Sequence, residues 1–211
     1  MQRGLMAAIL LLCFRSRWAG ADECPLATLQ QAAKAETELG AWEIQAWSPR
    51  MDFPRLTDQE SVRAAAAGVW RMPAECDTRL TVRSAGLEFW VPGYTGNPIV
   101  DGWFPVVVFT PKAPGLYTVS GTLKLSFTGD AADTNAVEWA VAKVRPGPRF
   151  KVLAGGRAGR GAEVALQEEA ALKTVNLAAG ESLGIAVWRS SHRYVGGGKL
   201  IGLAVSRAGG K

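Results

Sequence analysis

The feature that most constrains the fold of this chain is a strict alternation of apolar and polar residues between residues 115 and 127. The residues of one parity are almost all apolar: Tyr117, Val119, Gly121, Leu123, Leu125 and Phe127. Those of the other parity are mostly polar: Leu116, Thr118, Ser120, Thr122, Lys124 and Ser126. Successive side chains of a β-strand point to opposite faces, so a period of two predicts a long strand with one buried face.

Shorter runs of the same kind lie before and after this segment, between about residues 80 and 206. They are Leu80 with Val82, Leu87 with Phe89 and Val91, Val137 with Trp139 and Val141, Val175 with Leu177, Leu183 with Ile185 and Val187, and Ile201 with Leu203 and Val205. Segments rich in Gly, Pro, Asp and Asn separate them. Residues 103–109, WFPVVVF, are apolar at both parities, which predicts a strand covered on both faces. Many short strands without alternating helices predict an all-β sandwich or closed barrel.

The chain before residue 78 has a different pattern. Residues 25–39 are rich in Ala, Leu, Gln, Glu and Lys and precede Gly40, which predicts a helix. Residues 59–68 predict a second, shorter helix, and residues 42–46 predict a strand between the two. We therefore expect a partly helical N-terminal extension, residues 22–77, packed on a β-domain that spans residues 78–208.

The first 21 residues have the pattern of a secretory signal peptide. Arg3 precedes an apolar run, residues 5–14, and Ala19-Gly20-Ala21 is a small-x-small cleavage site. Ten apolar residues are too few to cross a bilayer, which takes about 20, and no later apolar run is long enough. We expect a secreted protein, extracellular or periplasmic, without a membrane span. Cleavage lowers the formal net charge from +5 to +2, so the basic composition does not imply nucleic-acid binding.

Two cysteines, Cys24 and Cys76, remain after this cleavage. In an oxidising compartment two cysteines allow one pairing. A Cys24–Cys76 disulfide is therefore predicted, and the alternative is two unpaired buried thiols.

Two short phrases carry a resemblance to a known fold family. Residues 109–121, FTPKAPGLYTVSG, and residues 177–187, LAAGESLGIAV, resemble recurrent elements of bacterial secreted jelly-roll modules of the carbohydrate-binding type. They also resemble, more weakly, the jelly-roll heads of the tumour-necrosis-factor and complement type. The resemblance covers roughly residues 85–207 and implies a jelly-roll β-sandwich. It transfers no binding residue, because the matched positions are turn glycines, turn prolines and inward-facing aromatics.

Catalytic and metal-binding patterns are weak in this sequence. The single histidine, His192, lacks a nucleophile elbow, and the inventory of metal ligands is thin. Asp130 and Asp133 leave calcium binding open beside a plain solvated turn. Glu168 and Glu169 would supply half of a glycosidase pair, but an exposed charged turn explains them better. No catalytic residue, metal ligand or cofactor is assigned.

The aromatic residues give the clearest binding candidates. Trp90 is out of phase with Leu87 and Phe89, and Trp188 is out of phase with its own apolar run. Tyr94 and Tyr194 follow them in polar loops. Exposed aromatic rings stack on apolar sugar faces, so these four residues are candidates for a glycan site if both tryptophans reach solvent on the same side. The alternative is that the N-terminal extension buries both tryptophans.

The leading functional hypothesis is a secreted non-catalytic binding module with a carbohydrate ligand. The alternative is a self-associating structural or interaction protein of the trimeric-head type, and therefore a homo-oligomer. A jelly-roll hydrolase or lyase acting on glycans is the third.

Overall fold

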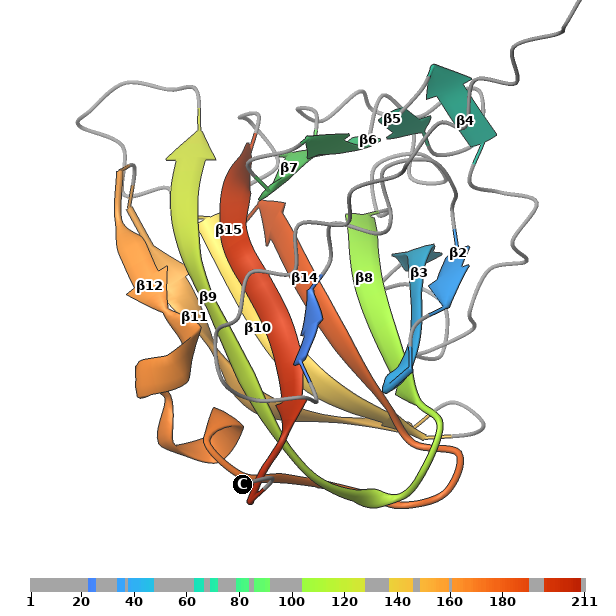
Figure 1. The fold of residues 1–211 in the computed structure, drawn as a ribbon. Helices are drawn as coiled ribbons and strands as arrows, with labels where there is room; N and C mark the ends of the chain where they lie inside the picture. The colour runs from blue at the N-terminus through green and yellow to red at the C-terminus, as the bar shows by residue number, and fades with distance from the viewer. Residues whose placement is uncertain are drawn as a thin grey trace, which may run out of the picture.

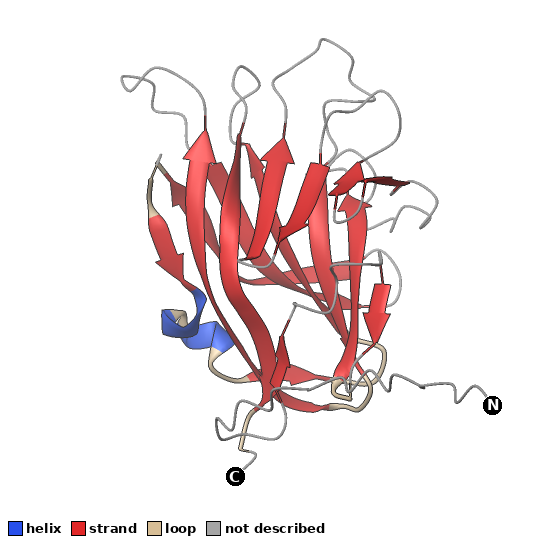
Figure 2. Cartoon of the chain, turned by 45° about the horizontal axis from the view of Figure 1, so that its top comes forward, coloured by secondary structure: helices blue, strands red, loops and turns tan. Residues whose placement is uncertain are grey.

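The computed structural model describes residues 23–25, 34–36, 38–47, 63–66, 69–71, 79–83, 86–91, 104–127, 137–145, 149–159, 161–189 and 196–209. Within these residues the chain forms two antiparallel sheets packed face to face, which confirms the all-β prediction (Figure 1). Strands make up most of the described chain, and its helical part is confined to two short 3₁₀ turns, η3 (Leu166–Glu168) and η4 (Ala170–Leu172) (Figure 2). None of the described helices is long and apolar enough to span a membrane.

The larger sheet has nine strands. Its main path, in order, is β12 (Glu163–Ala165), β9 (Gly115–Phe127), β15 (Gly196–Arg207), β7 (Gly86–Val91), β6 (Arg79–Arg83), β5 (Val69–Arg71) and β4 (Arg63–Ala66). In addition, β1 (Glu23–Pro25) pairs with β15, and β13 (Val175–Leu177) pairs with β9. The long alternating segment of the sequence is β9, which lies between β15 and the short edge strands β12 and β13.

The smaller sheet has six strands. Their order is β11 (Arg149–Ala158), β10 (Val137–Arg145), β14 (Ser182–Arg189), β8 (Phe104–Pro111), β3 (Gly40–Trp47) and β2 (Lys34–Glu36). The strand predicted at residues 42–46 is the central part of β3, which pairs along its whole length with β8.

The pairings define a jelly roll. An outgoing arm of strands, β7 to β10, pairs with a returning arm, so that β7 lies beside β15, β8 beside β14, β9 beside β12 and β13, and β10 beside β11. Successive strands of each arm fall in alternate sheets, and the antiparallel ribbon is thus rolled into a sandwich. The predicted jelly-roll sandwich is confirmed by this strand order.

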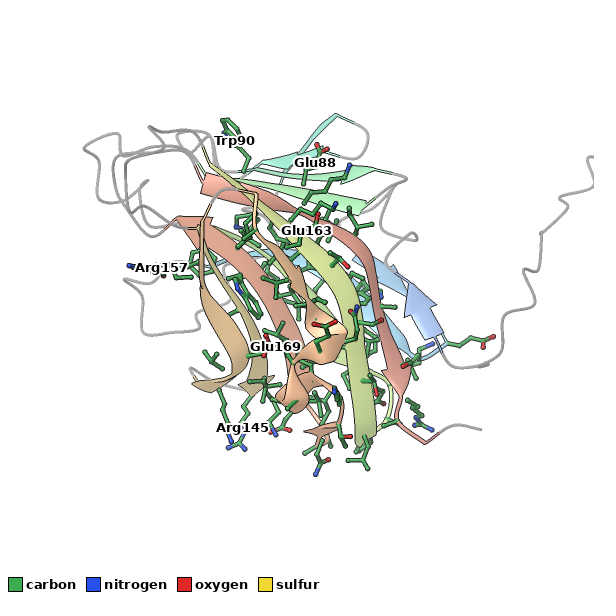
Figure 3. All side chains as sticks on the ribbon, turned by 90° about the vertical axis from the view of Figure 1, so that its left-hand side faces the viewer. Glu88, Trp90, Arg145, Arg157, Glu163 and Glu169 are labelled. Carbon is green, nitrogen blue, oxygen red and sulfur yellow. The ribbon has the colours of Figure 1, made fainter. Side chains whose placement is uncertain are left out.

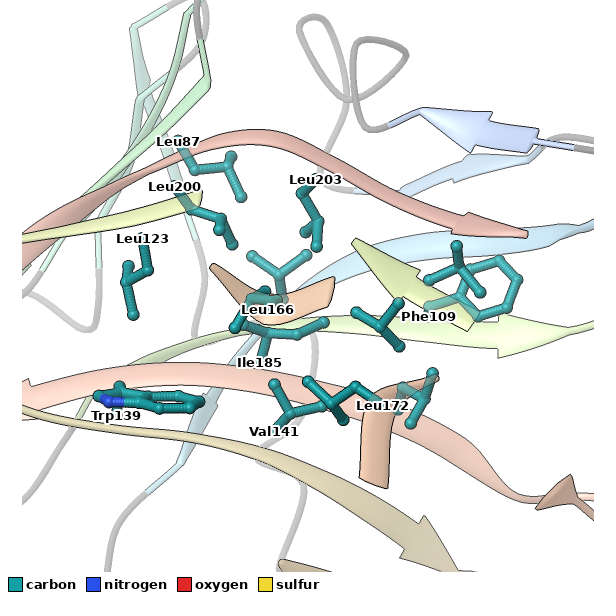
Figure 4. Close-up of a cluster of buried hydrophobic side chains, with 14 of the residues drawn as sticks. Leu87, Phe109, Leu123, Trp139, Val141, Leu166, Leu172, Ile185, Leu200 and Leu203 are labelled. Atoms are coloured by element: carbon teal, nitrogen blue, oxygen red, sulfur yellow. The ribbon is translucent and has the colours of Figure 1, made fainter. Parts of the chain in front are cut away.

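The core lies between the two sheets. Tyr117, Val119, Leu123 and Leu125 of β9 are at most 2% exposed, whereas Lys124 of the other parity is exposed. Figure 4 shows Leu87, Leu123, Leu200 and Leu203 from the larger sheet above Trp139, Val141 and Ile185 from the smaller one. Trp139 is a core residue, as its phase predicts. The Oη of Tyr117 donates a hydrogen bond to the carbonyl oxygen of Ala113 over 2.5 Å, which fastens β9 to the turn before it.

The smaller sheet is also buried on its outer face. All six residues from Phe104 to Phe109 are buried, as the doubly apolar run predicts. Val106 and Val108 point away from the main core and form a second apolar cluster with Phe104, Val144 and Ala186. The outer face of this sheet is therefore buried around β8 and β14.

The predicted N-terminal helices are wrong where the structure describes them. Residues 34–36 form β2, which pairs with β3, and residues 63–66 form β4, which pairs with β5. Helix propensity is a weak local preference, and hydrogen bonding to a sheet edge overrides it. The division of the chain at residues 77 and 78 stays a prediction; strands from both sides of that position pair in the same sheets.

Candidate functional site

The candidate site lies on the outer face of the nine-stranded sheet, where β7 carries Trp90. Leu87 and Phe89 are buried in the core, and Glu88 and Trp90 project from the opposite face (Figure 3). Trp90 is partly exposed, although its Nε1 atom is buried. The sequence phase thus correctly predicted the face on which Trp90 lies.

A row of four charged side chains crosses this face next to Trp90. Backbone register aligns Glu163, Lys124, Lys199 and Glu88 on β12, β9, β15 and β7. Lys124 Nζ lies 2.5 Å from Glu163 Oε1, and Lys199 Nζ lies 4.0 Å from Glu88 Oε1. Each side chain is between 37% and 55% exposed, so the pairs add little stability. They provide donors and acceptors at the surface instead.

The next row of the same face contains Trp90 itself. Trp90 pairs with Gly197 of β15 on one side and with Arg79 of β6 on the other. A Cβ atom on Gly197 would collide with the carbonyl oxygen of Phe89, so the close approach of β7 and β15 requires glycine here. The β15 position that pairs with Trp90 therefore carries no side chain.

Trp188 belongs to the other sheet. It pairs with Glu138 of β10, and it alternates with Ile185 and Val187, which are buried in the core. Position 188 therefore lies on the outer face of the six-stranded sheet, and neither sheet face carries both tryptophans. This corrects the expectation of one surface that holds Trp90 and Trp188 together, because phase along a strand cannot say to which sheet the strand belongs.

Other predicted residues lie partly or wholly outside the described part of the chain. Tyr94, Tyr194 and Cys76 are outside it, as are His192 and the loop with Asp130 and Asp133. Cys24 lies in β1, where it pairs with Val205. The Cys24–Cys76 disulfide and the roles of the two tyrosines stay predictions.

The two carboxylates that would form half of a glycosidase pair lie around η3. Glu168 is exposed and Glu169 is partly exposed. Among the described residues, no group of three or more His, Cys, Asp and Glu side chains is placed to hold a metal ion.

Sequence reasoning missed one buried charged group, Glu181, which begins the segment leading into β14. Its Oε1 accepts a hydrogen bond from Arg145 Nε at 2.7 Å, and its Oε2 accepts one from the backbone N–H of Ala178 at 2.9 Å. Lys143 Nζ lies 3.1 Å from Oε2 and donates to the carbonyl oxygen of Asn176. No sequence signal marked Glu181, because its charged partners, Lys143 and Arg145, come from β10, more than 30 residues earlier.

The environment of Glu181 lowers the pKa of its carboxyl group. Burial alone would raise this pKa, but the hydrogen bonds from Ala178, Lys143 and Arg145, with the nearby charge of Lys143, outweigh burial. The carboxylate is only 7% exposed and is bonded at both oxygens. Glu181 therefore joins the turn between β13 and β14 to β10. Because both of its oxygens are engaged in these bonds, we assign it a structural role and no catalytic one.

Comparison with known proteins does not assign the chain to a protein family. No family model matches the chain, and no curated protein matches it. Two solved structures are similar to it. Eiger TNF from S. frugiperda has a TM-score of 0.36 at 11% identity and covers 64% of this chain and 92% of its own. The C-terminal family 22 carbohydrate binding module of Clostridium thermocellum Xyn10B has a TM-score of 0.34 at 12% identity, covering 80% of this chain and 88% of its own. Similarities this weak carry no argument about function.

Proposed function

We propose that the protein is a secreted, non-catalytic binding module for carbohydrate, with its ligand on the outer face of the nine-stranded sheet around Trp90. The observation that carries the proposal is the position of Trp90. A large aromatic side chain stands partly exposed on a face whose neighbouring row is charged and open to solvent. A tryptophan needed only for the core would be expected at the other parity of β7, beside Leu87 and Phe89.

The surroundings of Trp90 suit a sugar. The indole ring offers an apolar surface for the C–H face of a pyranose, and the row with Glu88 and Lys199 offers hydrogen-bond acceptors and donors for hydroxyl groups. Gly197, at the β15 position paired with Trp90, adds no side chain of its own to this face. A single stacking residue with a polar rim gives weak affinity, because a small contact must offset the ligand's lost freedom.

Self-association is less well supported. It would need a broad exposed apolar surface. Among the described residues the large apolar side chains that are exposed are Leu116 and Val152, which lie on β9 and β11 of different sheets. The apolar cluster on the outer face of the six-stranded sheet, around Val106 and Val108, is buried within the chain.

The test is a glycan screen of the protein without residues 1–21, followed by titration of each ligand found. Trp90→Ala is expected to weaken binding on the order of tenfold or more, which corresponds to a lost aromatic contact. The unfolding midpoint should stay close to that of the parent protein.

Two further variants make this test specific. Val152→Ala, which truncates an exposed side chain on the other sheet, should leave binding unchanged, and Trp90→Phe should retain part of the affinity. If Trp90→Ala binds every ligand as well as the parent protein, or if no glycan binds at all, the proposal is wrong.

A further inference from the structure

The outer face of the nine-stranded sheet carries a second row of residues that extends from Trp90. Backbone register pairs Trp90 with Arg79, Arg79 with Arg71, and Arg71 with Arg63. These four positions lie on four neighbouring strands, β7, β6, β5 and β4 (Figure 1). Directly paired residues of an antiparallel sheet share a face, so the three arginine positions belong to the same face as Trp90.

We infer that the ligand of this face is an anionic glycan, a chain of sugars that carry carboxylate or sulfate groups. The inference rests on the proposed function and names its ligand class. Neighbouring strands are about 4.8 Å apart, so three cationic positions follow Trp90 at regular steps across the sheet. A linear polyanion that stacks one sugar on the tryptophan would present its acidic groups along this row.

The charge pattern distinguishes the arginine row from the row beside it. In the neighbouring row each lysine has a glutamate close by: Lys124 has Glu163, and Lys199 has Glu88. In the arginine row no register position is acidic; beyond Trp90 the row continues with Gly197 and Ser126. Like charges at directly paired positions of a sheet destabilise it. An anionic ligand on this face would offset the like charges that the three paired arginine positions bring onto neighbouring strands.

Arginine is also the residue type best suited to bind the acidic groups of a sugar chain. A guanidinium group is planar and donates two parallel hydrogen bonds to a carboxylate or sulfate, which a lysine ammonium group cannot do. The lysines of this face stand in the neighbouring row with their glutamates, and the arginines stand in the row of the tryptophan. Stacking by Trp90 and bidentate contacts from Arg79, Arg71 and Arg63 would act on one ligand chain.

A nucleic acid is the other common polyanion, and the face fits it less well. Single-stranded nucleic acids are held by successive aromatic residues that stack successive bases, whereas the register row of Trp90 contains one aromatic. Glu88 and Glu163 in the adjacent row confine the positive charge to a narrow line. A duplex would bring its phosphates over these carboxylates, while a single glycan chain would not.

The experiment measures affinity for heparin and polygalacturonate, and for neutral xylan and glucan, over a range of NaCl concentrations. The variant is Arg71→Gln, in the middle of the row, and the control is Arg157→Gln. Arg157 is exposed on the six-stranded sheet, where it bonds Glu138, so both variants remove one positive charge. Arg71→Gln should weaken binding of the polyanions about tenfold at low salt and reduce its salt dependence, and Arg157→Gln should change neither.

The conservative variant Arg71→Lys separates geometry from charge. It should restore the salt dependence but only part of the affinity, because the bidentate contact is lost. It also keeps the test decisive if Arg71→Gln fails to fold.

The other outcomes separate this inference from the proposed function. Binding of neutral glycans that depends on Trp90 but not on Arg71 would overturn the anionic ligand and leave the carbohydrate-binding proposal standing. Absence of binding to every glycan would overturn both. Preferential binding of single-stranded or duplex DNA over heparin would show that the arginine row serves a nucleic acid, and the inference would be wrong.

Discussion

The two outer faces of the sandwich differ in what they present to solvent. On the nine-stranded sheet, Lys124 and Glu163 are about half exposed and Trp90 is partly exposed. On the six-stranded sheet, Val106 and Val108 are at most 2% exposed although they point away from the main core. The nine-stranded sheet thus presents polar side chains beside Trp90, whereas the outer face of the six-stranded sheet is apolar and buried around β8 and β14. Of these two regions, the one around Trp90 has room for a ligand, and the one around Val106 and Val108 has none.

The largest expected effect concerns the buried side of the free sheet. Tyr117→Ala should lower the free energy of unfolding by about 3–5 kcal/mol, because it removes a fully buried ring from the core. Tyr117→Phe should cost about 1 kcal/mol, since it loses only the hydrogen bond to Ala113. Denaturant unfolding measures both. If Tyr117→Ala costs less than 1 kcal/mol, the inner face of β9 is not the core that its burial indicates.

A matched exchange tests the difference between the two outer faces. Val106→Thr places a hydroxyl group in the covered outer face of the six-stranded sheet and should cost about 1–3 kcal/mol. Thr122→Val makes the reverse change on the outer face of β9, where the residue is partly exposed, and should stay within about 0.5 kcal/mol of the parent protein. Equal effects in denaturant unfolding would contradict the contrast between the faces.

The smallest effect concerns Glu181, which lies where the chain passes from one sheet to the other. Its pKa is lowered in the folded protein, so its stabilising contribution is full above the ordinary pKa of glutamate and is lost as the pH falls through the folded value. The parent protein should therefore lose stability on acidification in part through this group. In Glu181→Gln, stability should be lower at neutral pH and should fall less as the pH drops.

A control and a contrary outcome complete this pH test. Glu163→Gln removes an exposed carboxylate from the polar face and should leave the acid-induced loss of stability nearly as it is in the parent protein. An unchanged acid profile in Glu181→Gln would show that the bonds of Glu181 between the β13–β14 turn and β10 do not contribute to stability.

The sequence predicted those parts of the structure that depend on neighbours along the chain. Alternation identified β9 and the buried phase of β7, and the doubly apolar run identified β8. The predictions over residues 25–39 and 59–68 failed where they can be compared, because β2 and β4 exist through pairing with another strand and not through local propensity. The assignment of Trp90 and Trp188 to different sheets likewise depends on strand order.

The arginine row illustrates the same limit at the site. Arg63, Arg71 and Arg79 are spaced eight residues apart, which is a detectable regularity. The spacing alone does not show that the three arginines share one sheet face. They do so because the pairings of β4 with β5 and of β5 with β6 bring the three positions into register. Trp90 then joins the row through a third pairing that no local pattern indicates.

The place of the last strand has a consequence for how the protein is made. β15 lies between β7 and β9, and its pairing of Leu200 with Leu87 joins residues more than 100 positions apart. During synthesis from the N-terminus, β7 and β9 are complete long before the strand that belongs between them. Such distant pairings form slowly, and until they form both strands expose unpaired edges that favour aggregation. The nine-stranded sheet is therefore completed only after β15 has been made, and deletion of residues 196–207 would remove a strand from inside this sheet and not from its edge.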